Sequence, residues 1–477
     1  MDERWINMLR SLIVAWHEGI LIYLILAIVM FSVLFLAAVR MLIRQRDVDS
    51  LQYDEMLNEE LAPPVSLLVP VYNSENMIVD RVERLLETQY ALYEIIIIND
   101  GSQDGTMQQL MDTYDLLPIQ SKVHYSGLER EIGQIRAVYR SMVHCHLLVI
   151  DKEYGGHMDS LNVGINMSQY PYVASIGQAT VLERDALVKI MKPVMSALPG
   201  EEIVACSGRV DMANGKYPFT SIQGITSSER ALSPLLIMQY IEYVRAFLIS
   251  GIGLVRYNIN ILLFTSQAFG VFKKNRIMEI GGYNTDSHVG HIELVMRLHK
   301  HMKQMKEPGR IIYIPDPICS VNVPESWSQL LKQRAGWHRQ LAGSLWEQRS
   351  MIGNPQYGWM GMVSIPYFIL VELMGPVLEI ATIIFLISGM WLQIVDVKLC
   401  LVLALLLVLY GSLLSACAVM FEIWSSRRAY TFREVTRLFL YACSETFWFR
   451  PMNNVFRIYG LLQVVGYGKK NSKHGKG

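Results

Sequence analysis

The sequence has little charge and no excess of either sign. Only 18% of its 477 residues are charged, the formal net charge is zero, and 52% of the residues are hydrophobic. A neutral chain has no general electrostatic attraction to nucleic acid, so nucleic acid is not an expected partner. Such low charge is unusual for a soluble enzyme of this length and favours membrane-spanning segments.

Cysteine is also scarce, and its spacing is irregular. The six cysteines form no Cys-x-x-Cys pair, and two of them lie within apolar runs. This pattern argues against a disulfide framework or a cysteine zinc site and fits a reducing, cytosolic environment. No internal repeat is visible in the sequence, and its length suggests two or three domains.

A long apolar run lies near the N-terminus. Residues 20–39 carry no charge and are numerous enough to cross the hydrocarbon core as a helix. Three arginines follow at once within residues 40–46, so the positive-inside rule places the N-terminus outside and the following chain in the cytoplasm. We expect an N-terminal segment over residues 1–46 and a polar linker over residues 47–62.

The C-terminal region, residues 351–477, contains further apolar segments. Those near 373–395 and 399–421 are long enough to span a membrane and close enough to form a hairpin. Residues 359–372 are too few to span and predict an interfacial helix. The short apolar segments within 438–465 suit either another hairpin or two interfacial segments. The sequence therefore predicts a multi-pass protein of the cell membrane in contact with the lipid bilayer.

Between the two apolar regions, residues 63–350 predict a cytoplasmic α/β domain. Residues 65–69 and 94–98 are short apolar runs typical of buried parallel strands, and residues 76–88 between them have apolar side chains at helical spacing. Ligands of open α/β sheets bind beyond the carboxyl ends of the strands. The turns after the two strands are therefore the candidate binding crevice.

These turns carry motifs of a known family. The sequences PVYNSE, from Pro70, and IIINDGSQDGT, around Asp100, resemble the nucleotide-binding half of a family 2 glycosyltransferase with the Rossmann-like GT-A fold. The flanking apolar segments resemble those of membrane-embedded, processive polysaccharide synthases. The resemblance implies a UDP-sugar held by the first turn, with the aspartate of the second turn on the uracil. Asp100-Gly101-Ser102 by itself also suits an ordinary turn at a strand end.

A third stretch extends the resemblance. Residues 155–164 match the family's Gly-Gly-Lys-x-Asp-Ala-Leu-Asn-x-Gly, except that His157 replaces the lysine and Ser160 the alanine. The nucleotide-binding residues implied by the resemblance are Pro70, Tyr72, Asn73, Glu75, Asp100 and Asp159.

The metal-binding motif of the family is absent. Its members hold Mg²⁺ or Mn²⁺ with an Asp-x-Asp pair, because hard cations prefer carboxylate oxygen. After the predicted strand at residues 172–176, this chain has Gly177-Gln178-Ala179 instead, so no metal ligand and no bound cofactor is predicted. Gln178 is a candidate contact for a phosphate or a sugar hydroxyl. Glu183 and Asp185 follow, at the start of the next helix, where capping is their expected role.

The family's general base is missing too. Its Glu-Asp pair is replaced by a stretch containing His291 and Glu293, which are the remaining candidates for proton transfer. Histidine titrates near neutrality, although a histidine at a helix start also suits a surface or capping position.

The family's Gln-x-x-Arg-Trp motif is partly kept. Gln333 and Trp337 match it, Gly336 stands in place of its arginine, and Arg334 is a candidate to supply the charge. With Gln178, these residues form the expected acceptor and diphosphate region. Trp337 would equally suit an aromatic anchor at the membrane interface.

Three functions fit these patterns. The resemblance implies a membrane enzyme of polysaccharide biosynthesis that transfers sugar from a UDP-sugar to a growing glycan. The missing metal pair, base and arginine favour a non-catalytic subunit or nucleotide sensor that partners an active glycosyltransferase or another polysaccharide-assembly protein. A channel or transport component gated by the cytosolic domain is a third hypothesis.

Overall fold

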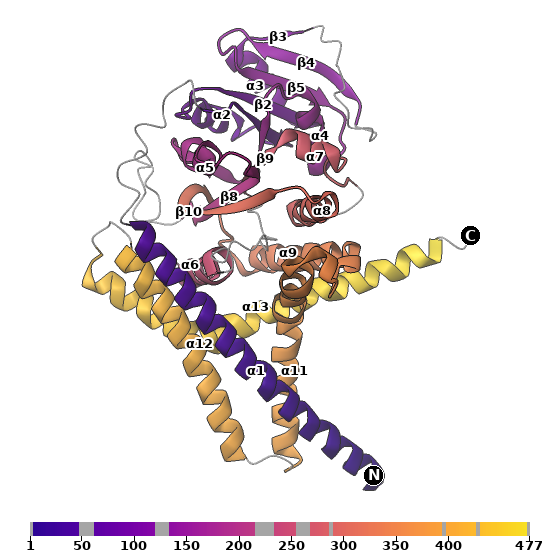
Figure 1. Cartoon of the computed structure of the whole chain (residues 1–477), viewed down its shortest axis with the longest axis vertical. Coiled ribbons are helices and arrows are strands. Elements are labelled where there is room, and N and C mark those ends of the chain that lie inside the picture. Colours follow the sequence, from indigo (N-terminus) through magenta and orange to yellow (C-terminus); the bar gives the residue numbers. More distant parts are fainter. Residues whose placement is uncertain are drawn as a thin grey trace.

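The computed structural model describes residues 3–46, 62–119, 133–214, 233–253, 268–285, 290–393, 397–425 and 430–474. The predicted linker, residues 47–62, lies outside this part except for residue 62, as do residues 286–289 ahead of His291. An α/β domain lies at one end of the molecule, and long helices extend from it at the other (Figure 1).

A ten-stranded mixed sheet forms the centre of the α/β domain, in the order β3-β4-β5-β2-β1-β6-β9-β8-β10-β7. The strands are β1 (Val65–Val71), β2 (Tyr93–Asp100), β3 (Leu116–Pro118), β4 (Ile135–Ser141), β5 (Leu147–Lys152), β6 (Tyr172–Ile176), β7 (Thr180–Leu182), β8 (Glu202–Met212), β9 (Phe269–Lys273) and β10 (Gly309–Val321). β1 pairs in parallel with β2, as the sequence predicts, and β5 and β6 extend the parallel part on either side. Four neighbouring strands therefore end at one edge of the sheet.

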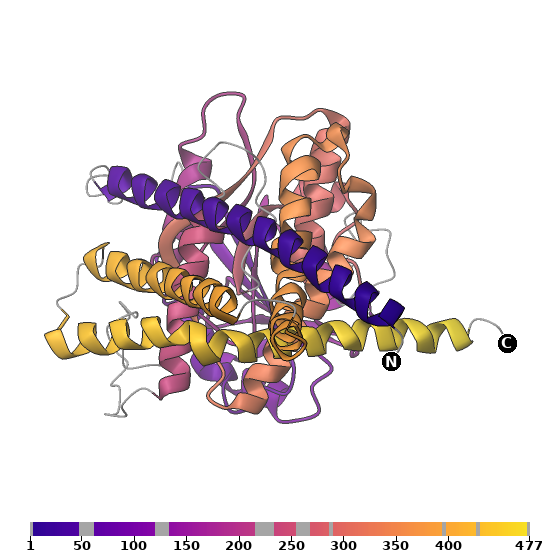
Figure 2. The same ribbon diagram turned by 90° about the horizontal axis from the view of Figure 1, so that it is seen from below.

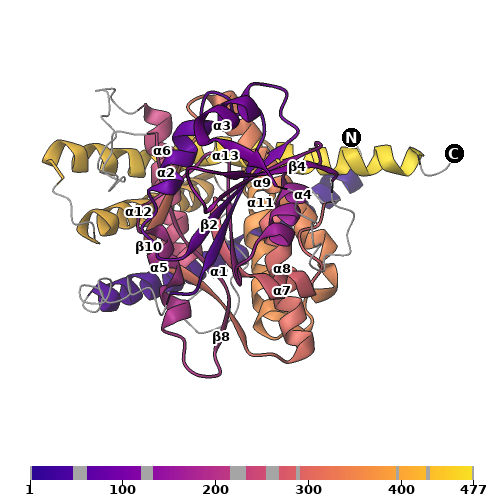
Figure 3. The ribbon, with the colours of Figure 1, turned by 90° about the horizontal axis from the view of Figure 1, so that it is seen from above.

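Helices cover both faces of this sheet (Figure 3). One apolar core joins the sheet to α2 (Ile78–Leu86), α3 (Thr106–Tyr114) and α5 (Ala186–Met195), and a second joins it to α4 (His157–Met167), α7 (Lys274–Glu279) and α8 (Gly290–Met305). Strands buried on both faces have no polar side, which explains the continuous isoleucine run of β2.

Long helices form the rest of the molecule (Figures 1 and 2). They are α1 (Glu3–Arg46), α6 (Pro234–Ala246), α9 (Trp327–Glu347), α11 (Gly375–Trp391), α12 (Val397–Ser425) and α13 (Phe432–His474). In the described residues, three helices are long and apolar enough to cross a membrane: Glu18–Ile43, Pro234–Ile252 and Ala404–Ser425. A bent pair of helices, Met360–Leu373 and Gly375–Trp391, would make a fourth.

Three elements differ from the sequence-based expectations. Residues 359–372 form short helical pieces that meet α11 at a bend of 44°. Residues 438–465 belong to one continuous helix, α13, so the hairpin alternative is wrong. The polar residues Arg450, Asn453 and Asn454 do not end this helix, and they line a cavity between helices. Helix α6 was not predicted: 78% of its apolar window is buried, and it packs with α12 and α13.

Candidate functional site

The turns after β1 and β2 are bound together by hydrogen bonds. The Asn73 N–H donates to Ser102 Oγ at 3.0 Å, and the Gln103 N–H donates to Asn73 Oδ1 at 2.9 Å. The Gly105 N–H donates to Glu75 Oε2 at 3.1 Å. The two turns that carry the family motifs are thus one rigid unit, in which Asn73 and Glu75 already use side-chain oxygens.

Two exposed aromatic rings stand beside this unit. Tyr72 is 37% exposed and Tyr154 is 69% exposed, and their ring centroids are 5.2 Å apart at an angle of 55°. Gly101 has a φ of +67°, and a Cβ there would lie 2.7 Å from the Tyr154 nitrogen. A glycine is therefore required for the β2 turn to approach Tyr154. The rings offer a surface on which a base could stack, whereas Pro70 is buried within β1.

Behind the turns lies a buried cluster of charges. Lys152, which has no exposed surface, places its Nζ 2.6 Å from Asp100 Oδ1 and 2.7 Å from Asp159 Oδ2. The backbone N–H groups of Gly155 and Gly156 also donate to Asp100, both at 2.9 Å. The ammonium compensates part of the negative charge, and Asp100 is held by three donors of its own chain.

The end of β6 offers no carboxylate. Gln178 is exposed in the turn between β6 and β7, where the metal pair was sought. Glu183 and Asp185 both pair with Lys189, at 2.6 and 2.9 Å, and Asp185 makes no side-chain capping bond. Among the described residues, no three His, Cys, Asp or Glu side chains are grouped closely enough to hold a metal ion. The donor set of this site therefore does not fit Mg²⁺ or Mn²⁺.

A cation reaches the same turn from α2. Arg81 Nη2 donates to the Gly177 carbonyl at 2.8 Å and to the Ile176 carbonyl at 3.5 Å. Burial lowers the pKa of His157, and the positive charge of Arg81 lowers it further, whereas Asp100 opposes this effect. Arg81 and Asp100 therefore act in opposite directions on His157 at the carboxyl edge of the sheet.

The two candidates for proton transfer are buried. Tyr283 Oη and His291 Nδ1 are 3.1 Å apart, and burial lowers the pKa of His291 to about 3. Arg297 donates two hydrogen bonds to the Glu293 carboxylate, at 2.5 and 3.0 Å. An efficient general base has a pKa near the working pH and an atom that is free to accept a proton. The pKa of His291 is too low, and the Glu293 carboxylate already accepts hydrogen bonds from Arg297.

Helix α9 carries the residues expected near the acceptor. Arg334 is buried, donates to Glu242 Oε2 of α6 at 2.7 Å, and lies 4.6 Å from the centroid of the Trp337 ring. Trp337 is 38% exposed, and the buried Gln333 Oε1 has no hydrogen-bond partner. Arg334 thus connects α9 to α6. The Gln333 Oε1 atom and the exposed part of the Trp337 ring are available to contact a ligand.

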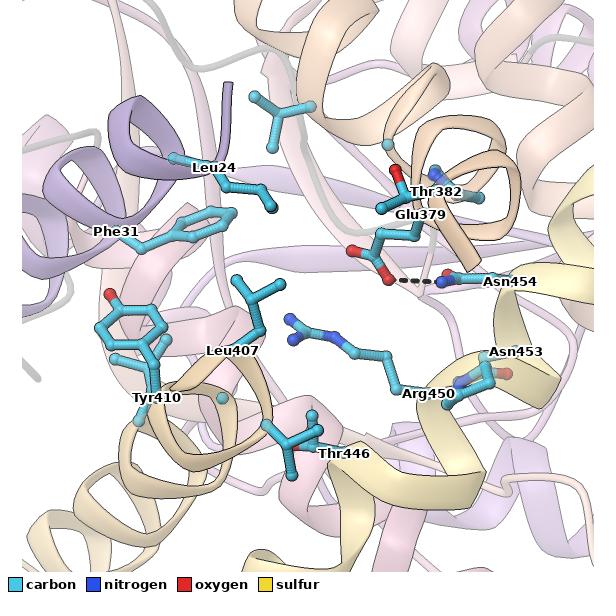
Figure 4. A pocket seen from close by; sticks show the side chains of 18 of the residues that line it. Leu24, Phe31, Glu379, Thr382, Leu407, Tyr410, Thr446, Arg450, Asn453 and Asn454 are labelled. Atoms are coloured by element: carbon cyan, nitrogen blue, oxygen red, sulfur yellow. Dashed lines mark hydrogen bonds between the residues drawn. The ribbon is translucent and has the colours of Figure 1, made fainter. Parts of the chain in front are cut away.

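A cavity of about 450 Å³ lies among α1, α6, α11, α12 and α13 (Figure 4). Arg450 extends into it from α13, and Asn454 Nδ2 donates to Glu379 at 2.6 Å. Glu242, the partner of Arg334, is part of its lining. Polar groups inside a set of apolar helices are costly and mark functional positions, so this cavity is a second candidate site connected to α9.

Sequence reasoning missed three residues of the first site: Arg81, Lys152 and Tyr154. Lys152 carried a signal, because it follows Asp151 at the end of an apolar run. The pattern gave no hint of the Arg81 contact, which joins segments 96 residues apart. Of the predicted residues, those that follow parallel strands are Tyr72, Asn73, Glu75 and Gln178. Asp100 is the last residue of β2, and Asp159 lies in the first turn of α4. Gln333, Arg334 and Trp337 lie on α9.

Comparisons with known proteins agree on one family. Residues 66–146 match the model of glycosyl transferase family 2. A poly-beta-1,6-N-acetyl-D-glucosamine synthase of Staphylococcus epidermidis is 25% identical over 289 residues, which cover 59% of this chain and 56% of the relative. The synthase of Staphylococcus aureus strain MSSA476 is 24% identical over 285 residues, covering 59% and 55%. The chain thus spans about half the length of the curated relatives it matches.

One solved structure has the same fold. A mannosyltransferase of Pyrobaculum calidifontis, in complex with GDP-Man and Mn²⁺, aligns with a TM-score of 0.51 at 14% identity, covering 92% of this chain and 99% of that one. This likeness confirms the predicted GT-A fold.

Proposed function

Because the chain belongs to glycosyltransferase family 2, we propose that its α/β domain binds a nucleotide sugar and transfers the sugar to a glycan at the cytoplasmic face of a membrane. The observation that carries this proposal is the hydrogen-bonded unit formed by the turns after β1 and β2. This unit presents the Tyr72 ring beside Asp100 at the carboxyl ends of parallel strands, where ligands of such sheets bind.

We take UDP-N-acetylglucosamine as the first donor to test. The relatives are named as synthases of a polymer of N-acetyl-D-glucosamine. The growing glycan would meet Gln333 and Trp337 of α9. The cavity, whose polar lining residues include Glu242, Asn453 and Asn454, would receive it. Sugar hydroxyls suit such a lining of amides, carboxylates and aromatic rings.

The chemistry available to this site is restricted. Mg²⁺ or Mn²⁺, where a family member binds it, neutralises the leaving diphosphate, but the residues at the end of β6 do not fit such an ion. Loss of a positioned general base costs roughly 10²- to 10⁴-fold in rate. We therefore expect transfer to be slow compared with a synthase that keeps all three motifs.

The test is a transfer assay with the full-length protein reconstituted in liposomes. Radiolabelled UDP-N-acetylglucosamine is supplied with Mg²⁺, with Mn²⁺ or with chelator, and polymeric product and released UDP are measured. Slow, metal-independent product formation is expected. A protein that binds neither UDP nor the sugar nucleotide by calorimetry under any condition would refute the proposal.

A non-catalytic role is the second candidate, and one observation favours it. The Glu293 carboxylate, in the stretch that replaces the family's Glu-Asp pair, accepts two hydrogen bonds from Arg297. Nucleotide binding without transfer, together with stimulation of an intact glycosyltransferase added to the same liposomes, would identify a regulatory partner of that enzyme.

A further inference from the structure

Arg81 is a cation without a counter-ion. Among the residues that the structure describes, its guanidinium donates to the Gly177 and Ile176 carbonyls alone, and its buried Nε has no acceptor there. In the described part of the chain, no Asp or Glu forms an ion pair with it, although neighbouring Arg84 pairs with Asp80. A charge that is removed from water without a partner is costly, and this cost usually indicates a function.

Arg81 remains charged although its side chain is partly buried. Burial lowers the pKa of this guanidinium to about 10, which still leaves it protonated at neutral pH. The neighbouring His157 is held in its neutral form, so it does not compete for an anion at this place. The result is an uncompensated positive charge at the carboxyl edge of the sheet.

The position of Arg81 is the decisive observation. The carbonyl that accepts its hydrogen bond at 2.8 Å belongs to Gly177, the residue that stands where the family has the first aspartate of its metal pair. The same chain that lacks both carboxylates thus has a fixed guanidinium against the turn from which they are missing. A guanidinium presents several N–H donors and binds phosphate oxygens in pairs.

We propose that Arg81 binds the diphosphate of the nucleotide sugar and replaces the divalent cation that the family uses there. This inference rests on the proposed function, because the diphosphate is part of the same donor. A preorganised cation can stabilise the charge that develops on a leaving group without recruiting an ion from solution. Binding of the diphosphate would then be independent of metal.

The experiment compares ligands that differ only in the diphosphate. Uridine, UDP and inorganic pyrophosphate are titrated calorimetrically into the full-length protein in detergent with chelator present. UDP is expected to bind the unchanged protein at least about tenfold more tightly than uridine, as fits a charge-assisted contact. Addition of Mn²⁺ should leave this preference unchanged.

Two substitutions separate charge from shape. Arg81→Gln keeps an N–H donor for the turn but removes the charge, and it is expected to abolish the preference for UDP while uridine still binds. Arg81→Lys keeps the charge and should retain part of the preference. Arg84→Gln, one turn along the exposed face of α2, is the matched control and should bind all ligands like the unchanged protein.

A further variant restores the family pattern. Arg81→Gln combined with Gly177→Asp and Ala179→Asp supplies the missing carboxylate pair, and UDP is expected to bind it only with Mn²⁺. Equal preference for UDP in the unchanged protein and in Arg81→Gln would overturn the inference while leaving the proposed function intact. Failure of the unchanged protein to bind either uridine or UDP would refute both.

Discussion

At the scale of single residues, the site contains two cations, one buried and one partly buried. Lys152 is enclosed between Asp100 and Asp159, so its charge serves the protein interior. Arg81 touches only neutral carbonyls, so its charge is available to a ligand. Their different partners explain why we assign a structural role to the first and a binding role to the second.

Replacement of Lys152 by methionine is expected to destabilise the fold strongly. It would leave two carboxylates buried without their cation, which costs about 3–5 kcal/mol. The loss would appear as a lower thermal unfolding midpoint of the full-length protein in detergent. Adding Asp100→Asn and Asp159→Asn to Lys152→Met removes the uncompensated charges and should recover part of the stability. A Lys152→Met protein as stable as the unchanged protein would contradict this account.

Acid should destabilise the domain through His291. Its folded pKa of about 3 lies below the ordinary value of 6.5, so between these values the unfolded chain binds a proton that the folded chain does not. Stability is therefore fully present above about pH 6.5 and declines as pH falls toward 3, by at most roughly 1.4 kcal/mol per pH unit. His291→Gln should reduce the loss of thermal stability on acidification, whereas His301→Gln, on the outer part of the same helix, should not.

At the scale of elements, α9 and α13 determine how the two halves of the molecule meet. Gly460 of α13 lies so close to α9 that a Cβ would be 2.4 Å from the Ala335 carbonyl oxygen. Arg339 of α9 also donates to Gln463 of α13 at 3.2 Å. This close packing holds Trp337 over the helices that surround the cavity.

A side chain at position 460 should separate these helices. Gly460→Leu overpacks the contact and is expected to destabilise it by about 1–3 kcal/mol. Limited proteolysis should then cleave α13 faster. Gly336→Ala is the matched control, because a Cβ there meets nothing within 4 Å, and an exposed glycine-to-alanine change in a helix is neutral or stabilising. Equal protection of α13 in both variants would show that the close approach is unimportant.

At the scale of the whole molecule, an ion pair joins the α/β domain to the long helices. Arg209 of β8 donates to both oxygens of Glu422 in α12, at 3.0 and 2.6 Å. A second ion pair, between Arg334 of α9 and Glu242 of α6, joins two of the long helices to each other. A rigid connection of this kind would keep a transfer site in a fixed position above the cavity.

Breaking the Arg209 connection should weaken the whole assembly. Glu422→Ala leaves a buried arginine with Asp211 as its remaining partner and is expected to cost about 3–5 kcal/mol. The triple variant Arg209→Met, Asp211→Asn and Glu422→Leu should be closer to the unchanged protein, because no charge of this cluster is left unpaired. The thermal unfolding midpoint measures the stability of both variants. Arg184→Ala, which breaks an exposed pair with Glu87, should change stability by less than about 1 kcal/mol.

The candidate site was predictable to the extent that it follows strand ends. Tyr72 and Asp100 follow β1 and β2, and the apolar runs that predict these strands also predict where the residues meet. Arg81 was not predictable, since its partner at Gly177 is distant in sequence and a helical arginine is normally exposed. The continuity of α13 was missed because Arg450, Pro451, Asn453 and Asn454 interrupt its apolar pattern.

The amino-acid pattern alone was sufficient for the α/β class, the parallel order of β1 and β2, the apolar spans at both ends and the absence of a metal pair. Each of these depends on local periodicity or on the identity of residues within a short motif. The tertiary structure alone decided that Lys152 neutralises Asp100 and Asp159, that Arg81 faces the turn without carboxylates, and that α9 borders the cavity. These are pairings between distant segments, and charge compensation inside a fold depends on which side chains packing brings together.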